Sequence, residues 1–474
     1  MEVHYTNNLL NKTKKIGCYV FTVCNNIESI IKLIKTHFGI KQFPKTFLKS
    51  TDLFKRLYFD DYEFLFIFMK KKCNHKTLYE SFGMLGKDLS KYEQNIQIYL
   101  DQKDDNTIKN QVLSFILGAY ETLDYKSLKK EIKKNVYFYH TKKYEVIIKN
   151  AIQIATVQNE VRFLSNSPAN ILNNETYEKH IKKNMMKNVK INVLDESKLK
   201  KLGLNLILAV NQGSKHKARL IQLTYKKNVK KSDKPIVLIG KGVMFDTGGY
   251  HIKRGDFSDM KNDMTSSSII YGLMKLIAYL NKDGYYIALL PIVENMISGN
   301  SSRPGDVIVS YNKKTVEITN TDAEGRLILA DSIAYSEKFK PKLIIDLGTL
   351  AGANTSFLGS KAGTILGNNN KVIKKLLNCC IKNNEHLLEI PIWEEYIEET
   401  KSKIADLKND SGGSGAGVMP GAFLSHFVPN KSGWVHIDIA SIDYIYKNSN
   451  MRYNGATGSI LRSLLDLMLE KIEM

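Results

Sequence analysis

Short apolar runs alternate with amphipathic segments along the last two-thirds of the chain, the pattern of an α/β domain built on a largely parallel sheet. The apolar runs predict buried strands at residues 235–240, 286–293, 343–347 and 435–439. The segments around them predict helices at residues 266–280, 327–339, 372–381 and 458–472. We therefore expect an α/β fold in which a central, mostly parallel mixed sheet is flanked by helices.

The first 150 residues have a different character. Apolar runs such as residues 64–69 mix there with helical segments such as residues 111–121, and no cluster of catalytic residue types appears. A lysine-rich connection at residues 125–149 leads into a helix that begins near Tyr144. A chain of 474 residues is also too long for one ordinary domain. We predict two domains, a smaller N-terminal α/β domain at residues 1–155 and a larger domain at residues 156–474.

Composition limits the class of protein. A hydrophobic content of 43% supports sizeable cores and excludes global disorder. No apolar run approaches the roughly 20 residues that span a bilayer, so no membrane partner is expected. The N-terminus lacks a basic segment followed by an apolar one, which excludes an evident secretory signal. The five cysteines show no metal-ligand spacing, and the adjacent Cys379 and Cys380 are interpreted as buried thiols. A cytoplasmic location fits these features.

The net charge of +21 permits two interpretations. Lysine-rich runs at residues 129–134, 182–187 and 226–231 could neutralise phosphates and so bind nucleic acid. The runs are scattered, however, and no aromatic-basic recognition motif accompanies them. We favour a solvated surface and keep DNA binding as the alternative role.

Residues 320–326, which read Asn-Thr-Asp-Ala-Glu-Gly-Arg, carry the strongest chemical signal. Asp322 and Glu324 stand directly before the apolar run at residues 327–330, where carboxylates seldom lie unless a cation holds them. The alternative is that both carboxylates favour the positive end of the following helix. That alternative leaves Arg326 without a role.

A second cluster lies upstream and contains Lys241, Asp246, Lys253 and Asp263. Lys241 and Asp246 follow the predicted strand at residues 235–240, and ligands collect at the carboxyl ends of strands in open α/β sheets. Taken alone, Asp246 could be a turn residue and Asp263 a helix N-cap. Asp256 and Asp259 are interpreted as solvated loop charges.

Together the two clusters supply four carboxylates, from Asp246, Asp263, Asp322 and Glu324. Oxygen-rich ligation without His or Cys disfavours structural zinc and suits two divalent cations that activate water. The phosphate-binding motifs G-x-x-x-x-G-K-[ST] and G-x-G-x-x-G are absent, as are H-E-x-x-H and G-x-S-x-G. The sequence therefore predicts a two-metal hydrolase centre.

These motifs resemble those of the M17 leucyl aminopeptidases, cytosolic enzymes with two metals. Residues 320–326 match the family signature without a change, and residues 240–249 match its first metal loop. Supporting matches lie at residues 294–299, 303–306, 346–350 and 434–440. The resemblance runs from about residue 156 to the C-terminus and leaves the first 155 residues unmatched.

The resemblance implies a metal-dependent aminopeptidase that hydrolyses the N-terminal peptide bond of peptides. Two ions (Zn, Mn, Co or Mg) would be held by Lys241, Asp246, Asp263, Asp322 and Glu324. Lys241 would bind as a neutral amine, and Lys253 would polarise the scissile carbonyl and stabilise the oxyanion. Arg326, with the backbone near Gly325 and Leu350, would hold a bicarbonate that acts as general base.

The resemblance also implies the substrate pocket and the assembly. The side-chain pocket would be formed by Met260, Asn320, Ala323, Thr349, Gly352 and Ala456. These residues are apolar or small, so neutral or hydrophobic N-terminal residues such as Leu or Met are expected. A homohexamer is implied as well. A DNA-binding or structural role on the same scaffold remains the alternative function.

Overall fold

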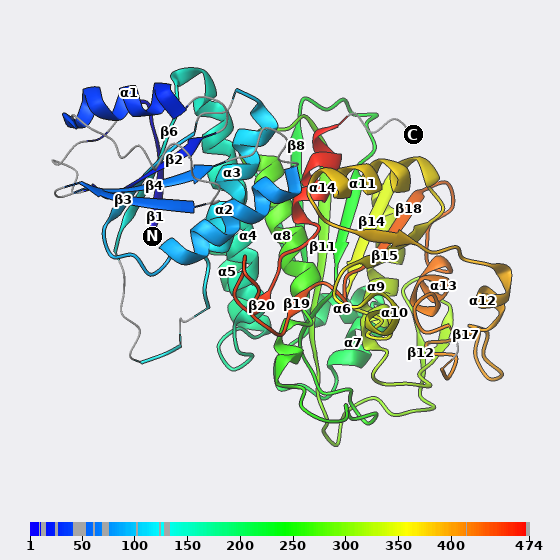
Figure 1. Cartoon of the computed structure of the whole chain (residues 1–474). Coiled ribbons are helices and arrows are strands. Elements are labelled where there is room, and N and C mark those ends of the chain that lie inside the picture. Colours follow the sequence, from blue (N-terminus) through cyan, green and yellow to red (C-terminus); the bar gives the residue numbers. More distant parts are fainter. Residues whose placement is uncertain are drawn as a thin grey trace. The chain divides into compact units, whose positions relative to one another are not determined.

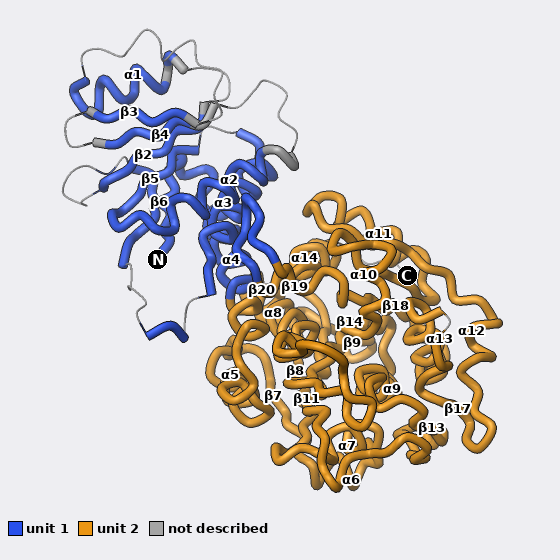
Figure 2. Tube along the Cα trace, turned by 60° about the horizontal axis from the view of Figure 1, so that its bottom comes forward, with its two compact units in different colours: residues 1–159, 447–454 blue, residues 160–446, 455–474 orange. Residues whose placement is uncertain are grey.

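The computed structural model describes the chain except for residues 9, 11–15, 24–26, 41–53, 60–61, 69–74, 101–102, 123–124, 128–132, 414 and 471–474. It divides into two compact units, shown in Figure 2. The first unit contains Met1–Asn159 and Lys447–Asn454, and the second contains Glu160–Tyr446 and Gly455–Met474. The boundary at residue 155 stays a prediction. Cys24, Cys73, part of the lysine-rich run at 129–134 and the end of the last predicted helix lie outside the described residues.

The first unit is built on a six-stranded sheet with the strand order β1-β6-β5-β2-β4-β3. Its strands are β1 (Glu2–Thr6), β2 (Ile16–Val23), β3 (Phe54–Phe59), β4 (Tyr62–Phe68), β5 (Asn95–Tyr99) and β6 (Asn135–Tyr139). Its helices are α1 (Ile27–Phe38), α2 (His75–Leu89), α3 (Asp105–Gly118) and most of α4 (Glu145–Asn166). Only the edge pair β3 and β4 is antiparallel among the described pairings of this sheet. Aromatic side chains of β2 and β4, such as Phe21 and Phe64, form part of its core.

The second unit carries a nine-stranded sheet with the order β16-β15-β18-β14-β9-β11-β8-β7, and β10 pairs with β11. These strands are β7 (Lys190–Leu194), β8 (Arg219–Lys227), β9 (Ile236–Gly240), β10 (Gly242–Asp246), β11 (Gly284–Asn295), β14 (Leu343–Gly348), β15 (Gly363–Gly367), β16 (Leu387–Glu389) and β18 (Gly433–Asp438). Parallel pairs join β9 to β11 and β14, β14 to β18, and β10 to β11. Antiparallel pairs join β8 to β7 and β11, and β15 to β18.

The remaining elements surround that sheet (Figure 1). The helices are α5 (Asn174–Asn184), α6 (Glu196–Leu202), α7 (Asn205–Asn211), α8 (Thr265–Tyr279), α9 (Glu324–Tyr335), α10 (Asn354–Leu358), α11 (Asn370–Lys382), α12 (Glu394–Glu398), α13 (Met419–Ser425) and α14 (Leu461–Leu469). Short strands form two further sheets, β12 (Val307–Val309) with β13 (Thr315–Glu317) and β17 (Leu407–Lys408), and β19 (Tyr444–Ile445) with β20 (Gly455–Ala456).

The central sheet of the second unit is covered on both faces. Every residue of β9 is buried, and because side chains alternate between the faces of a strand, both faces need packing partners. Side chains of α7, α9 and α13 share one core cluster with alternate residues of β9 and β11, among them Val237 and Leu289. Helix α14 packs with both α8 and α11, and α8 also contacts β9 and β11. The predicted mixed, mostly parallel α/β fold with flanking helices is confirmed.

Two smaller predictions also concern the fold. Cys379 and Cys380 are buried thiols that are not joined in a disulfide, as interpreted from the sequence. Within the described part of the chain, every helix is too short or too polar to cross a bilayer.

Candidate active site

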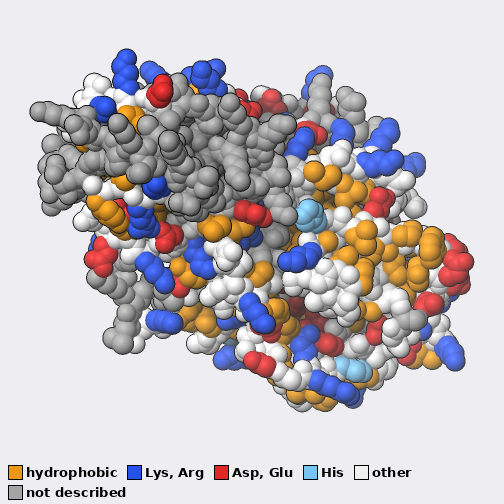
Figure 3. Space-filling model, in the orientation of Figure 1, with side chains coloured by type: hydrophobic (Ala, Val, Ile, Leu, Met, Phe, Trp, Pro, Cys, Tyr) orange, Lys and Arg blue, Asp and Glu red, His pale blue; other side chains and the backbone are white. Residues whose placement is uncertain are grey.

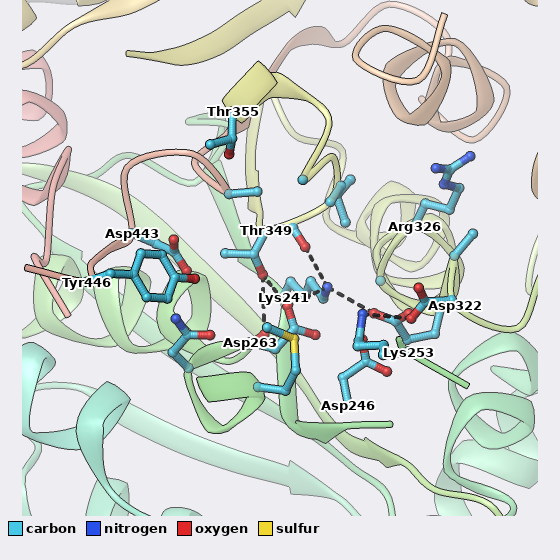
Figure 4. Close-up of a pocket in the computed structure, with 18 residues that line it drawn as sticks. Lys241, Asp246, Lys253, Asp263, Asp322, Arg326, Thr349, Thr355, Asp443 and Tyr446 are labelled. Atoms are coloured by element: carbon cyan, nitrogen blue, oxygen red, sulfur yellow. Dashed lines mark hydrogen bonds and ion pairs between the residues drawn. The ribbon is translucent and has the colours of Figure 1, made fainter. Parts of the chain in front are cut away.

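A cavity of about 310 Å³ opens where several parallel strands end (Figure 4). Lys241 follows β9, Asp246 ends β10, Thr349 follows β14, and Ala440 follows β18. The carboxyl ends of adjacent parallel strands lie at one edge of a sheet, which is where α/β enzymes bind their ligands. The complete lining is Lys241, Asp246, Lys253, Met260, Asn262, Asp263, Asp322, Ala323, Glu324, Gly325, Arg326, Thr349, Leu350, Gly352, Thr355, Ala440, Asp443 and Tyr446.

Three carboxylates from the two sequence clusters meet in this cavity. Asp246, Asp322 and Glu324 each offer one oxygen, and these oxygens all lie within 4.8 Å of one another. Oxygen Oε2 of Glu324 and oxygen Oδ2 of Asp263 are buried, and no hydrogen-bond donor among the described residues reaches them. Because a buried carboxylate oxygen without a donor is costly, this arrangement suits a divalent cation bound by oxygen ligands.

Lys241 lies among these carboxylates and is almost completely buried. Its Nζ is 2.8 Å from Oδ1 of Asp263 and 2.9 Å from Oε1 of Glu324. It also donates a hydrogen bond to the backbone carbonyl of Thr349 over 2.6 Å. Burial lowers the pKa of Lys241, but the carboxylates of Asp263 and Glu324 outweigh it and hold that pKa above its ordinary value. In this arrangement Lys241 is an ammonium ion.

Lys253 contacts the other two carboxylates. Its Nζ is 2.7 Å from Oδ2 of Asp246 and 2.6 Å from Oδ1 of Asp322. Burial lowers the pKa of Lys253, and the surrounding carboxylates, Asp246 first, outweigh that effect and raise it. Lys253 is therefore a permanent positive charge at the cavity wall.

The carboxylates carry an excess of negative charge that the two lysines do not balance. Burial and the adjacent Glu324 together raise the pKa of Asp246 to about 7, although Lys253 and Lys241 oppose the shift. Burial likewise raises the pKa of Asp263 well above its ordinary value, although Lys241 opposes the shift. For Glu324 burial is outweighed by Lys241 and Lys253, so its pKa lies below the ordinary value. Divalent cations would replace the retained protons and let the whole set ionise.

The structure bears on the alternative roles of these carboxylates. Helix α9 begins at Glu324, so this carboxylate does lie in the first turn, at the positive end of the helix, whereas the N-cap, Ala323, makes no side-chain hydrogen bond. Helix α8 likewise has Met264 as its N-cap, which excludes Asp263 from that position. Asp246 does stabilise a turn, because its Oδ1 accepts the backbone N–H of Gly248 over 2.9 Å. Its other carboxylate oxygen, Oδ2, takes no part in that turn.

The loop after Asp246 requires glycine at Gly248. This residue has φ of +85°, and a Cβ there would lie 2.3 Å from the carbonyl oxygen of His251 and 3.0 Å from Oδ1 of Asp322. A larger residue would therefore strain the backbone and displace the segment that leads to Lys253. Gly248 thus allows the close approach of two segments that carry charged side chains.

Arg326 lies on the opposite side of the cavity from Asp443 and Tyr446 (Figure 4). It is 7% exposed, and its Nη1 donates a hydrogen bond to the carbonyl of Asn409 over 2.6 Å. The Asp410 carboxylate, 3.6 Å away, is its ion-pair partner. Burial lowers the pKa of Arg326, which remains cationic. A buried guanidinium at a cavity wall is suited to a small planar anion.

The predicted side-chain pocket is brought together in part. Met260, Ala323, Thr349 and Gly352 line the cavity, as do the predicted anion contacts Gly325 and Leu350. Asn320 does not line it, because its amide donates to Asp410 over 2.9 Å and its side-chain oxygen accepts from the N–H of Asp322. Ala456 is also outside the lining; it lies in β20, and its N–H donates to Asn166.

Comparison with known proteins identifies the family. The family model described as "Cytosol aminopeptidase family, catalytic domain" matches residues 159–465, more than half of the chain. The chain belongs to this family. It is accordingly an aminopeptidase, a hydrolase of peptides, and the predicted family is confirmed.

Relatives and a solved structure agree with this assignment. A probable cytosol aminopeptidase of Phytoplasma mali (strain AT) is 34% identical over 452 residues, covering 91% of this chain and 90% of the relative. The cytosol aminopeptidase of Haemophilus influenzae (strain ATCC 51907 / DSM 11121 / KW20 / Rd) is 38% identical over 330 residues, covering 69% and 66%. A bottromycin maturation enzyme solved in complex with Mn shares the fold, with a TM-score of 0.83, 22% identity and coverage of 96% of this chain and 99% of that one.

Sequence reasoning missed several residues of this aminopeptidase site. The cavity lining also includes Asn262, Thr355, Ala440, Asp443 and Tyr446. Two further residues position groups at the cavity from outside the lining. Asn295 donates to Oδ1 of Asp246 over 2.8 Å, and Asp438 accepts the backbone N–H groups of Leu350 and Ala351. Asp438 lies near the end of the strand predicted at residues 435–439, and Asp443 follows that strand. The carboxyl end of this strand was therefore the sequence signal that could have identified both residues.

Proposed function

We propose that the chain is a metal-dependent aminopeptidase that removes neutral or hydrophobic N-terminal residues from peptides, using water activated by two divalent metal ions. The observation that carries this proposal is the meeting of three carboxylate oxygens within 4.8 Å of one another at the strand ends. Family membership supplies the reaction class, and the cluster supplies a reason for metal dependence.

The residues that would hold the two ions are those that the family resemblance assigned. They are Lys241, Asp246, Asp263, Asp322 and Glu324, all of which line one cavity. The donor set fits, because among the described residues no hydrogen-bond donor reaches the buried oxygens Oδ2 of Asp263 and Oε2 of Glu324. Lys241 would bind a metal ion only after its ammonium group loses a proton and becomes a neutral amine. The predicted ions are Zn, Mn, Co and Mg; carboxylate ligands suit Mg and Mn and also occur at Zn sites. When bound, a pair of such ions activates water and polarises the scissile carbonyl.

Lys253 would stabilise the negative charge that develops on the scissile carbonyl oxygen. Its ammonium group is held at the cavity wall by Asp246 and Asp322 at 2.7 and 2.6 Å, so it needs no rearrangement before it can donate. A pre-positioned donor in a water-poor site is worth more than the same donor in water.

Arg326 would hold a bicarbonate ion, the possible general base of the reaction. Its guanidinium lines the cavity together with Gly325 and Leu350. A Cβ at Gly325 would lie 2.5 Å from Cε of Lys241 and 2.7 Å from Cδ2 of Leu350, so only glycine leaves this wall its present shape. Cationic charge beside an unobstructed backbone suits a small anion.

The side-chain pocket supports acceptance of aliphatic residues. Met260, Ala323 and Gly352 present apolar or small surfaces to the cavity. A Leu or Met side chain would bury its apolar surface against them. A cytoplasmic location and a homohexameric assembly belong to the same proposal, the former supported by relatives named cytosol aminopeptidase and the latter by the family resemblance alone.

Digestion of a peptide library tests this function directly. We expect single residues to be released from free N-termini only, with Leu and Met among the preferred ones, after loading with Mn²⁺. The matched library with acetylated N-termini is the control and is expected to remain intact. Cleavage inside acetylated peptides, or no release from free peptides with any of the four metals, would contradict the proposal.

A further inference from the structure

Asp443 is a buried acidic group that the proposed chemistry does not use. It lines the cavity and is only 6% exposed. In Figure 4 it lies next to Tyr446, on the opposite side of the cavity from Arg326. It is therefore separated from the wall that would hold the general base, and it lines the same cavity as Thr349 and Met260, which were predicted to form the side-chain pocket.

The backbone fixes the position of this carboxyl group. The N–H of Asp443 donates to the carbonyl of Ile439 over 2.9 Å, which anchors it to the end of β18. Its own carbonyl accepts the N–H of Thr457 over 2.8 Å, and the Thr457 hydroxyl donates to the carbonyl of Ile442 over 2.7 Å. The backbone of Asp443 is therefore held from both directions, and its buried side chain forms part of the cavity wall.

Among the described residues, no cationic side chain forms an ion pair with the carboxylate of Asp443. Its own backbone N–H, which also donates to the carbonyl of Ile439, interacts with it, and Lys241 acts on it only electrostatically. Burial raises the pKa of Asp443 well above its ordinary value, and the acidic neighbours Asp263 and Asp438 raise it further. An unpaired acid that is buried at a cavity wall is costly unless a ligand supplies its partner.

A metal ion is not the partner that the geometry favours. The carboxylates whose oxygens gather within 4.8 Å of one another are Asp246, Asp322 and Glu324, and Asp443 is not among them. If a peptide is bound across the cavity, the end of its N-terminal side chain, which extends away from the reacting atoms, would instead contact Asp443.

Tyr446 adds a second acceptor on the same side. Its hydroxyl donates a hydrogen bond to Oδ2 of Asp259 over 2.7 Å. Because the hydrogen is engaged there, the phenolic oxygen offers its lone pairs to a donor from the cavity. Its ring is 65% exposed, so Tyr446 forms the rim and Asp443 the interior of this part of the pocket.

We propose that Asp443, assisted by Tyr446, lets the pocket accept N-terminal residues with an aliphatic stem and a cationic end, namely lysine and arginine. The stem would lie along Met260 and Ala323, and the ammonium or guanidinium group would pair with the carboxylate. Without a cation, burial favours the neutral form of the carboxyl group, so Leu and Met are accepted as well. This inference rests on the proposed aminopeptidase function and extends its substrate class.

Two substrates that differ only by the terminal charge provide the test. Lysyl and norleucyl derivatives of a fluorogenic amine share the same stem length, so the ratio of their kcat/KM values isolates the contribution of the ammonium group. We expect Asp443→Asn to lower the lysyl-to-norleucyl ratio by roughly 10- to 100-fold, the effect of losing a hydrogen-bonded charge. Asp256→Asn removes a carboxylate from an exposed loop and is the matched control, with an unchanged ratio expected.

The outcomes separate this inference from the function on which it rests. Hydrolysis of the norleucyl substrate with no measurable lysyl hydrolysis, or a ratio that Asp443→Asn leaves unchanged, would overturn the role of Asp443 alone. Failure to hydrolyse either substrate after metal loading would overturn the function itself. Because asparagine has the shape of aspartate, the variant should fold, and thermal unfolding of both variants checks this.

Discussion

Replacing Glu324 by glutamine is expected to abolish peptide hydrolysis and the binding of metal. The substitution keeps the shape of the side chain but removes the carboxylate that meets Asp246 and Asp322 within 4.8 Å. It also removes one of the anionic partners of the buried Lys241 ammonium, whose Nζ lies 2.9 Å from Oε1 of Glu324. We expect kcat/KM for a leucyl substrate to fall roughly 10³-fold or more, because both water activation and carbonyl polarisation depend on the ions. Metal content after gel filtration, measured by mass spectrometry, should fall with it.

Asp331→Asn is the matched control for this prediction. Asp331 is a buried carboxyl group in the same helix, α9, and it accepts backbone N–H groups of Leu206, Ile207 and Tyr311 outside the cavity. Burial raises its pKa to about 7. The control should lose stability but keep its metal and its activity per folded molecule. Retention of full metal content and activity by the Glu324 variant would refute the assignment of this ligand.

Replacing Lys253 by methionine is expected to separate catalysis from metal binding. Methionine keeps much of the aliphatic stem and removes the ammonium that lies 2.6 Å from Asp322 and 2.7 Å from Asp246. If Lys253 stabilises the oxyanion, kcat should fall roughly 10²- to 10³-fold while KM changes little, because the interaction is made in the transition state. Steady-state kinetics on a leucyl substrate, with metal content measured in parallel, checks both parts.

The neighbouring Arg254 provides the control for Lys253. It is exposed and does not line the cavity, so Arg254→Gln removes one positive charge from the same loop without touching the site. Its kcat should match that of the unaltered protein. A Lys253→Met protein with undiminished kcat would show that the oxyanion is stabilised by other groups.

The local part of the fold was predictable because it depends on short-range patterns. The buried strand at residues 235–240 and the helix at residues 266–280 correspond to β9 (Ile236–Gly240) and α8 (Thr265–Tyr279). The order β16-β15-β18-β14-β9-β11-β8-β7 was not predictable, because it depends on which apolar faces meet after long connections. The grouping of Lys447–Asn454 with the first unit had no local signal either.

The candidate site was predictable where its residues lie in compact motifs at strand ends. Lys241 follows β9 directly and Asp246 ends β10, while Asp322 and Glu324 lie at the start of α9, so their chemistry was visible in single segments. Asp443 was missed because its burial depends on how the chain turns after β18 and pairs with the segment that contains Thr457. Asn320 was placed in the pocket although its amide hydrogen-bonds to Asp410, a partner 90 residues away.

The central claim is tested most directly by a metal titration. Mn²⁺ is added stepwise to chelator-treated protein, and the rate of leucyl p-nitroanilide hydrolysis is measured after each addition. The claim is that the carboxylates of Asp246, Asp322 and Glu324, with Lys241 and Asp263, hold two ions on which hydrolysis depends. We predict no hydrolysis without metal and a rate that rises to a plateau at about two equivalents per chain. Full activity in the chelator-treated protein, or a plateau that is reached at one equivalent, would contradict it.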